Sequence, residues 1–181
     1  MRRPFVVAAA AAALAACASG GPPIVSTAAI IPTNATATAV MRDGAGHELG
    51  TLTLTETGAG LVTTGTLRGL APGAHGIHVH AVGNCDAAGF TSAGGHWNPA
   101  MRMHGFDNPM GPHMGDMRNI AVGADSVATV NTITAGGTLH GTAGLLDADG
   151  AAVVIHAGAD DYHSDPAGNS GARIACGVVT P

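Results

Sequence analysis

From about Thr36 onward, apolar and polar residues alternate along this chain, which is the pattern of β-strands that bury one face. The run Thr-Leu-Thr-Leu-Thr at 51–55 alternates cleanly, and 61–67 follows it after a glycine turn. Turn dipeptides such as Asp43-Gly44 separate neighbouring runs. We predict strands near residues 36–43, 47–57, 60–69, 74–82, 118–123, 126–134, 152–157 and 173–179. The sequence therefore predicts an all-β domain.

The composition agrees with one strand-rich domain, because only 10% of the 181 residues are charged, 3% are aromatic and 28 residues are glycine. All seven basic residues are arginine, and the chain contains no lysine. Without Arg2 and Arg3, which belong to a predicted leader, five basic residues stand against twelve acidic ones, a net charge of −7. An acidic chain without basic clusters argues against nucleic acid as a partner.

Residues 1–16 have the pattern of a signal peptide. Arg2 and Arg3 form a positive start, and the apolar stretch 5–16 is too short to span a membrane stably. We therefore expect this segment to direct export and then to be removed.

The leader ends in Leu14-Ala-Ala-Cys17, which resembles the bacterial lipoprotein signal, where the cysteine is lipidated and becomes the new N-terminus. We expect residues 17–35 to be a lipidated N-terminus and flexible tether, and residues 36–181 to be the folded domain. The protein would then lie in the periplasm or cell envelope, held to the membrane by its lipid. The alternative is simple secretion after cleavage behind Ala18, with Cys17 incidental.

Two cysteines remain in the domain, Cys85 and Cys176. In an oxidising compartment they would form one pair, whereas the alternative is two free buried thiols.

Histidines are concentrated between residues 75 and 116 at spacings that suit bound metals. His78 and His80 lie two apart on a predicted strand, so their imidazoles share one face while Ile77 and Val79 share the other. His156 ends a separate apolar strand and can supply a third nitrogen. These three histidines are candidate ligands of one ion.

A second set of ligand-type residues lies in the long irregular stretch 83–117. His104, His113 and Asp116 would close a tetrahedral zinc site if one more nitrogen were added. His96 lies between the two sets in sequence, and an imidazolate can bind one metal through each ring nitrogen. The sequence therefore predicts a two-metal site.

Residues 36–180 resemble the bacterial copper,zinc superoxide dismutases. The motifs that carry the resemblance are Gly76-Ile-His-Val-His80, Gly83-Asn-Cys85, Ser92-Ala-Gly-Gly-His-Trp-Asn-Pro99, Gly111-Pro-His-Met-Gly-Asp116, Val154-Ile-His156 and Ala172-Arg-Ile-Ala-Cys-Gly-Val178. The resemblance implies an eight-stranded antiparallel Greek-key β-barrel or sandwich of immunoglobulin-like architecture. Trp97 departs from the family, which more often has phenylalanine there, and we expect it to be tolerated as packing.

The resemblance also implies a role for each site residue. The copper ligands would be His78, His80, His96 and His156, and the zinc ligands His96, His104, His113 and Asp116, with one copper and one zinc per chain. Cys85 and Cys176 would form the family's disulfide within the subunit, and Asp160 would link the copper ligand His78 to the zinc ligand His104.

The implied activity is dismutation of superoxide to oxygen and hydrogen peroxide in a ping-pong redox cycle. Arg173 would attract and position superoxide, and His96 would release the copper side of its bridge and carry a proton. Because the chain has no lysine, Arg173 would be the main nearby cation. The sequence leaves the oligomeric state open, with a homodimer as one option.

Other interpretations stay open at this stage. The protein could be a periplasmic copper- and zinc-binding lipoprotein with little turnover, or an interaction module that reuses the sandwich. Five methionines crowd the predicted zinc loop and either fill irregular gaps or collect copper through their soft thioethers: Met101, Met103, Met110, Met114 and Met117.

Overall fold

The structure, a computed structural model, describes residues 34–181, so the predicted signal peptide and Cys17 lie outside the described residues. Within this range the chain forms strands β1 (Thr36–Asp43), β2 (Glu48–Thr57), β3 (Gly60–Arg68), β4 (Gly73–His75), β5 (Ile77–His80), β6 (Ile120–Val122), β7 (Val127–Ala135), β8 (Ala152–His156) and β9 (Arg173–Thr180), with one short 3-10 segment, η1 (Ala88–Ala93). In the same range no helix is long and apolar enough to cross a bilayer.

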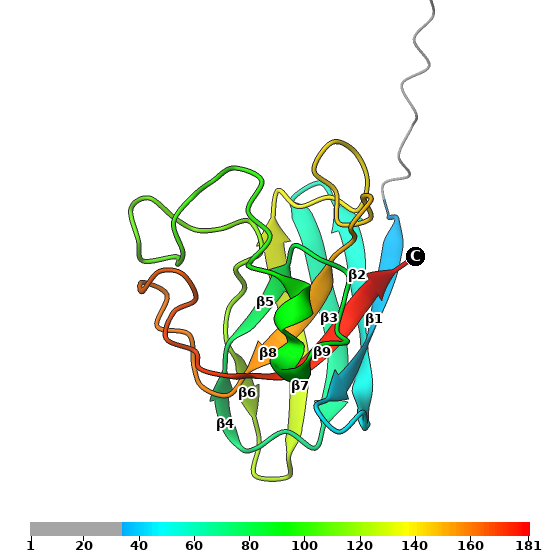
Figure 1. Cartoon of the computed structure of the whole chain (residues 1–181), viewed down its shortest axis with the longest axis vertical. Coiled ribbons are helices and arrows are strands. Elements are labelled where there is room, and N and C mark those ends of the chain that lie inside the picture. The colour runs from blue at the N-terminus through cyan, green and yellow to red at the C-terminus, as the bar shows by residue number, and fades with distance from the viewer. Residues whose placement is uncertain (1–33) are drawn as a thin grey trace, which may run out of the picture. The chain divides into compact units, whose positions relative to one another are not determined.

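Seven strands form one antiparallel sheet in the order β5-β8-β9-β1-β2-β3-β7, and β4 pairs with β6 in a second, two-stranded sheet (Figure 1). Gly76 alone joins β4 to β5 at one edge of the large sheet, and a tight turn at 123–126 joins β6 to β7 at the other edge. The small sheet therefore links both edges of the large one, and the strands curl around a common core. The predicted antiparallel all-β fold class is confirmed.

The predicted strand 74–82 is two strands rather than one, which is why the count is nine and not eight within the described residues. Its first half, β4, pairs with β6, and its second half, β5, pairs with β8. At the break, the Gly76 N–H donates to the Gly158 carbonyl at 2.8 Å and the Gly76 carbonyl accepts from the His156 N–H at 2.9 Å. A side chain at Gly76 would press on Ser170 and His78, so glycine allows this change of partner.

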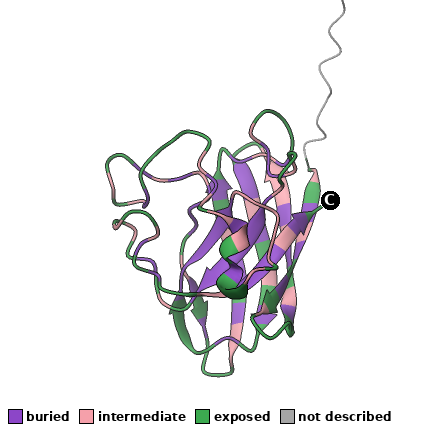
Figure 2. Cartoon of the chain, viewed as in Figure 1, coloured by how far each residue is buried: buried purple, intermediate pink, exposed green. Residues whose placement is uncertain are grey.

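The alternating sequence buries one face of strands β1 and β2, and Figure 2 shows the resulting striped colouring. In β1, Ala37, Ala39 and Met41 are buried. In β2, Leu52 and Leu54 are fully buried, while the threonines at 51, 53 and 55 remain partly or fully exposed. Each such leucine contributes roughly 1.5–3 kcal/mol through the apolar surface that it removes from water.

Strands β5 and β8 are instead buried on both faces. On one face, Val79 and Ile155 belong to the main hydrophobic core. On the other face, Val154 packs with Phe90 of η1 and with Cys176 in a second, smaller cluster. The histidines of β5 therefore lie on the face covered by η1 and the long loops, outside the main core.

Candidate metal centre

Strands β5 and β8 position three of the predicted ligands. His78 and His80 are buried on the face of β5 opposite Ile77 and Val79, as their spacing predicted. His156 is buried at the end of β8, next to them across the ladder. Together they present three imidazoles from a rigid part of the sheet.

The remaining ligands come from the loop between η1 and β6, green in Figure 1, which is fastened to β5 by main-chain hydrogen bonds. The Val79 N–H donates to the Gly115 carbonyl at 2.9 Å, the Gly115 N–H to the Trp97 carbonyl at 2.8 Å, and the Trp97 N–H to the Val79 carbonyl at 2.8 Å. These three residues, which we call the backbone triangle, each neighbour a predicted ligand in sequence. A Cβ at Gly115 would collide with the Val79 carbonyl, so only glycine permits this approach.

His78, His80, His96 and His156, the four-histidine group, place one ring nitrogen each within 4.8 Å of the others. Three of these rings have a fixed acceptor on the opposite nitrogen: His78 Nε2 lies 2.7 Å from Asp160, His80 Nδ1 lies 2.9 Å from the Gly94 carbonyl, and His156 Nδ1 lies 3.1 Å from the Gly171 carbonyl. A neutral imidazole that donates from one nitrogen offers a lone pair at the other.

Those inward nitrogens are buried without a hydrogen-bond partner in the described part of the chain: His78 Nδ1, His80 Nε2, His96 Nε2 and His156 Nε2. Buried polar atoms nearly always have a hydrogen-bond partner. Four buried nitrogens that face one another without such a partner therefore indicate a site for a bound ion. An all-nitrogen set fits copper. The residues therefore suit the ion that the resemblance implies.

Burial also keeps this group neutral, which metal binding requires. Loss of hydration lowers the pKa of His80 to about 2, that of His78 to about 3 and that of His156 to about 4. Burial lowers the pKa of His96 as well. The four imidazoles thus keep free lone pairs at neutral pH.

His96, His104, His113 and Asp116 form a second group, which we call the mixed group, and its ligand atoms also lie within 4.8 Å of one another. The Nδ1 atoms of the three histidines lie 2.8, 3.1 and 3.4 Å from Asp116 Oδ1. Three nitrogens and one carboxylate oxygen make the tetrahedral donor set that zinc prefers. His96 belongs to both groups, one ring nitrogen to each, as a bridging imidazolate would.

Hydrogen bonds determine the charge of the mixed group. Burial opposes ionisation of Asp116, but hydrogen bonds from His104, His113 and His96 hold its pKa well below the usual range. Burial likewise opposes the charge on His104, but its hydrogen bonds to Asp116 and Asp160 raise its pKa to about 9.

Asp160 connects the two groups, because its carboxylate lies 2.7 Å from His78 Nε2 and 3.0 Å from His104 Nε2. This is the link that the sequence resemblance implied. Asn119 holds the main chain of Asp160 through two hydrogen bonds of 2.9 Å, and the Tyr162 N–H donates to Asp160 Oδ1. Sequence reasoning missed Asn119 and Tyr162, since neither lies in a ligand motif.

Arg173 lies opposite His156 in the ladder between β8 and β9. Its guanidinium donates to the carbonyl oxygens of Phe90 and Gly94, both at 2.7 Å. The Gly94 carbonyl also accepts from His80. The predicted positive charge is therefore held beside the four-histidine group by the loop that carries η1.

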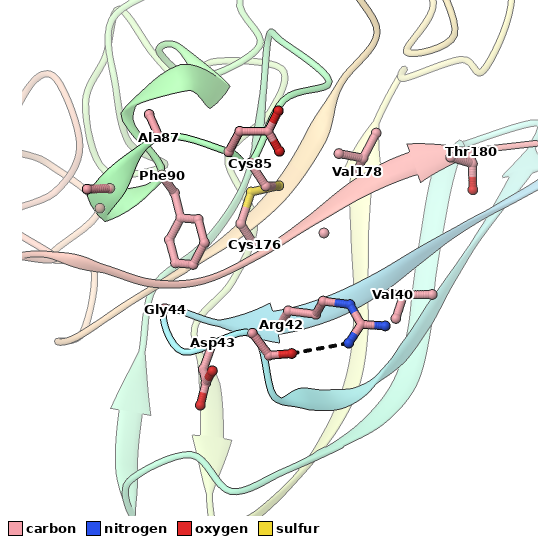
Figure 3. A pocket seen from close by; sticks show the side chains of 15 residues that line it. Val40, Arg42, Asp43, Gly44, Cys85, Ala87, Phe90, Cys176, Val178 and Thr180 are labelled. Carbon is pink, nitrogen blue, oxygen red and sulfur yellow. Dashed lines mark hydrogen bonds between the residues drawn. A yellow bond between two sulfur atoms is a disulfide. The ribbon is translucent and has the colours of Figure 1, made fainter.

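Cys85 and Cys176 form a disulfide, so the alternative of two free thiols is wrong. Figure 3 shows the disulfide and the Phe90 ring beside a cavity of about 510 Å³ that Arg42 and Val40 line from β1. None of the metal-centre histidines lines this cavity, so its size does not mark the site of the chemistry. The disulfide instead ties the η1 loop, which holds Arg173, to β9.

His75 has a structural role and is not a metal-ligand candidate. It is buried, and its ring nitrogens lie 2.7 Å from the His156 carbonyl and 2.8 Å from the Ala71 carbonyl. It belongs to neither ligand group.

Comparison with known proteins gives the chain a family. The family model described as copper/zinc superoxide dismutase (SODC) matches residues 48–179. The chain is 42% identical over 147 residues to a superoxide dismutase [Cu-Zn] of Caulobacter vibrioides. This alignment covers 79% of this chain and 84% of that protein.

Two solved structures have the same fold. A superoxide dismutase-like protein from Bacillus subtilis aligns with a TM-score of 0.75 and 39% identity, covering 78% of this chain and 96% of that one. The Cu/Zn superoxide dismutase from Brucella abortus aligns with a TM-score of 0.63 and 30% identity, covering 80% and 99%. On this sequence match and shared fold, the chain belongs to the copper/zinc superoxide dismutase family.

Proposed function

We propose that the protein dismutates superoxide to oxygen and hydrogen peroxide at a copper centre bridged through His96 to a structural zinc. The observation that carries the proposal is the set of four buried, unpaired imidazole nitrogens that face one another beside the Arg173 guanidinium. A metal store needs the nitrogens but not the arginine.

In this proposal His78, His80, His96 and His156 bind copper, and His96, His104, His113 and Asp116 bind zinc. Copper, when bound, supplies the one-electron redox chemistry by which one superoxide is oxidised and the next reduced, while zinc is redox-silent. Every other step depends on residues of the chain.

Arg173 attracts the anion and fixes its approach, because its guanidinium keeps its charge at every physiological pH and cannot turn away from its two carbonyl partners without losing both hydrogen bonds. His96 would carry a proton at Nε2, which has no hydrogen-bond partner in the described part of the chain, and give it to the second superoxide. The other proton that this reduction needs comes from solvent. Asp160 keeps the rings of His78 and His104 in the orientation and tautomer that the site requires.

The test is metal analysis combined with an activity assay on protein reconstituted with both ions. We expect one copper and one zinc per chain and catalytic removal of superoxide. A single metal per chain would contradict the ligand assignment. Full loading with little turnover would favour the alternative, a copper- and zinc-binding protein. The Bacillus subtilis relative, which is described as superoxide dismutase-like, is a suitable reference for this assay.

We also propose export to the periplasm or cell envelope and anchoring through an acylated Cys17. The support is the sequence pattern of residues 1–17 together with the disulfide, which persists in oxidising compartments. Cys17→Ala should abolish lipidation and release the protein from membranes. Wild-type protein recovered entirely in the soluble periplasm, beginning at Ser19, would mean simple secretion. The oligomeric state stays open, with a homodimer as one option, and sedimentation of the mature protein would decide it.

A further inference from the structure

The methionines of the loop before β6 divide into two kinds. Met117 is fully buried in the main core and Met114 packs against it, so these two fill gaps in the packing. Met101, Met103 and Met110, the exposed methionine cluster, have 90%, 42% and 65% of their surface exposed. Packing does not explain them.

Exposure of this kind is concentrated on one loop. Among the described residues, the exposed large hydrophobic side chains are Val40, Ile133 and the three members of the cluster. Isolated apolar residues on a surface need no explanation, but three methionines within ten positions of one loop do.

Hydrogen bonds hold the three residues near one another. The side chain of Asn98 fixes the main chain of Arg102, the residue between Met101 and Met103. Asn98 accepts a hydrogen bond from the Arg102 N–H at 2.9 Å and donates one to the Arg102 carbonyl at 2.8 Å. The Met103 N–H donates to the Met110 carbonyl at 3.1 Å, which brings the two limbs of the loop together. With three rotatable bonds in each side chain, the thioethers can converge on one ion from this fixed backbone.

The chemistry of the cluster selects the ion. Thioether sulfur is neutral and soft, so it binds Cu(I) well and offers little to zinc or to hard divalent ions. Arg102 lies between two of the methionines, but its guanidinium is engaged by the Gly111 carbonyl at 2.7 Å, and the exposed carboxylate of Asp107 lies on the same loop. We propose that Met101, Met103 and Met110 form a surface site for Cu(I), separate from both buried ligand groups.

The test uses the full protein with copper and zinc already bound, reduced and kept free of oxygen, so that only further copper is counted. Cu(I) is added in competition with a chromophoric Cu(I) chelator, and the methionine methyl groups are followed by ¹³C NMR. We expect one additional Cu(I) per chain, with shifts at the methyl groups of Met101, Met103 and Met110. The methyl signals of Met41, Met114 and Met117 should not shift.

A triple variant, Met101→Leu, Met103→Leu and Met110→Leu, removes the sulfur but keeps similar size and apolar character, and should weaken the additional binding by at least roughly tenfold. The matched control is Met114→Leu, on the same loop, which should bind like the wild type. No additional copper, equal affinity in the triple variant, or shifts confined to Met114 and Met117 would each overturn the proposal. The starting protein is fully loaded, so these results do not depend on the two buried sites or on dismutation.

Discussion

Arg173 and Gly94 are joined by a hydrogen bond of 2.7 Å, from Nη2 of the guanidinium to the main-chain carbonyl oxygen. The same oxygen accepts a hydrogen bond from His80 of the four-histidine group. One carbonyl thus sets the position of a metal-ligand ring and of the cation that would guide the substrate. A shift of this loop would move both at once.

Replacing Arg173 with alanine should lower the dismutation rate by roughly tenfold or more, because no lysine exists to share the attraction of the anion. The remaining activity should lose much of its salt dependence, while copper and zinc contents stay the same. Stopped-flow measurement of superoxide decay over a range of ionic strengths tests this. Arg173→Lys keeps the charge and should retain more activity than alanine. Unchanged dismutation at low ionic strength in the alanine variant would show that Arg173 does not guide superoxide.

Asp160→Asn should weaken metal binding, because the carboxylate that orients His78 and His104 loses its charge. Groups that support ligands in this way typically change metal affinity by roughly 10- to 100-fold. A competition titration of zinc against a chelator measures the change. The control is Asp161→Asn, since Asp161 is exposed and hydrogen-bonds only within its own loop, to Ser164 and neighbouring residues. Equal zinc affinity in the Asp160 variant and this control would contradict the linking role.

Single ligand replacements should separate the two metals. His156 belongs only to the four-histidine group and His113 only to the mixed group. His156→Ala should therefore lose copper and keep zinc, whereas His113→Ala should weaken zinc first. His96→Ala should affect both ions. Elemental analysis after dialysis gives the result, and loss of the same metal in the first two variants would mean that the groups are not separate sites.

Removing the disulfide should destabilise the fold. Cys85 and Cys176 are 91 residues apart, and in the chain-entropy model a crosslink across so long a loop contributes about 4–5 kcal/mol to the free energy of unfolding. The double variant Cys85→Ala, Cys176→Ala should therefore unfold at a lower denaturant concentration, as equilibrium unfolding can measure. The wild-type protein with reductant should follow the variant. A difference below about 1 kcal/mol would argue that the bond stabilises little.

Strand periodicity and residue parity predicted much of the centre. The spacing of His78 and His80 was enough to place both rings on one face, because successive side chains of a strand alternate. The break at Gly76 was not predictable in the same way, since it depends on the partners that the strand meets on each side. The alternation of apolar and polar residues continues through such a break, so the alternation alone does not reveal it.

Contacts made by main-chain atoms also escaped prediction. The partners of Arg173 are the carbonyls of Phe90 and Gly94, and every residue has a carbonyl, so no sequence pattern marks them. Exposure of Met101 but not Met117 has a similar cause: the path of a long loop, not the residue type, decides which methionine meets the core.

The backbone triangle of Val79, Trp97 and Gly115 has a consequence for how this centre can change. Its hydrogen bonds use only main-chain atoms, so none of them involves the side chains at the neighbouring positions 78, 80, 96 and 116. Donor atoms can therefore be exchanged one at a time while the three segments keep their mutual positions. An engineer could use this to change the metal preference of the chain, for example with a thiolate or a second carboxylate, and leave the strands of the two sheets unchanged.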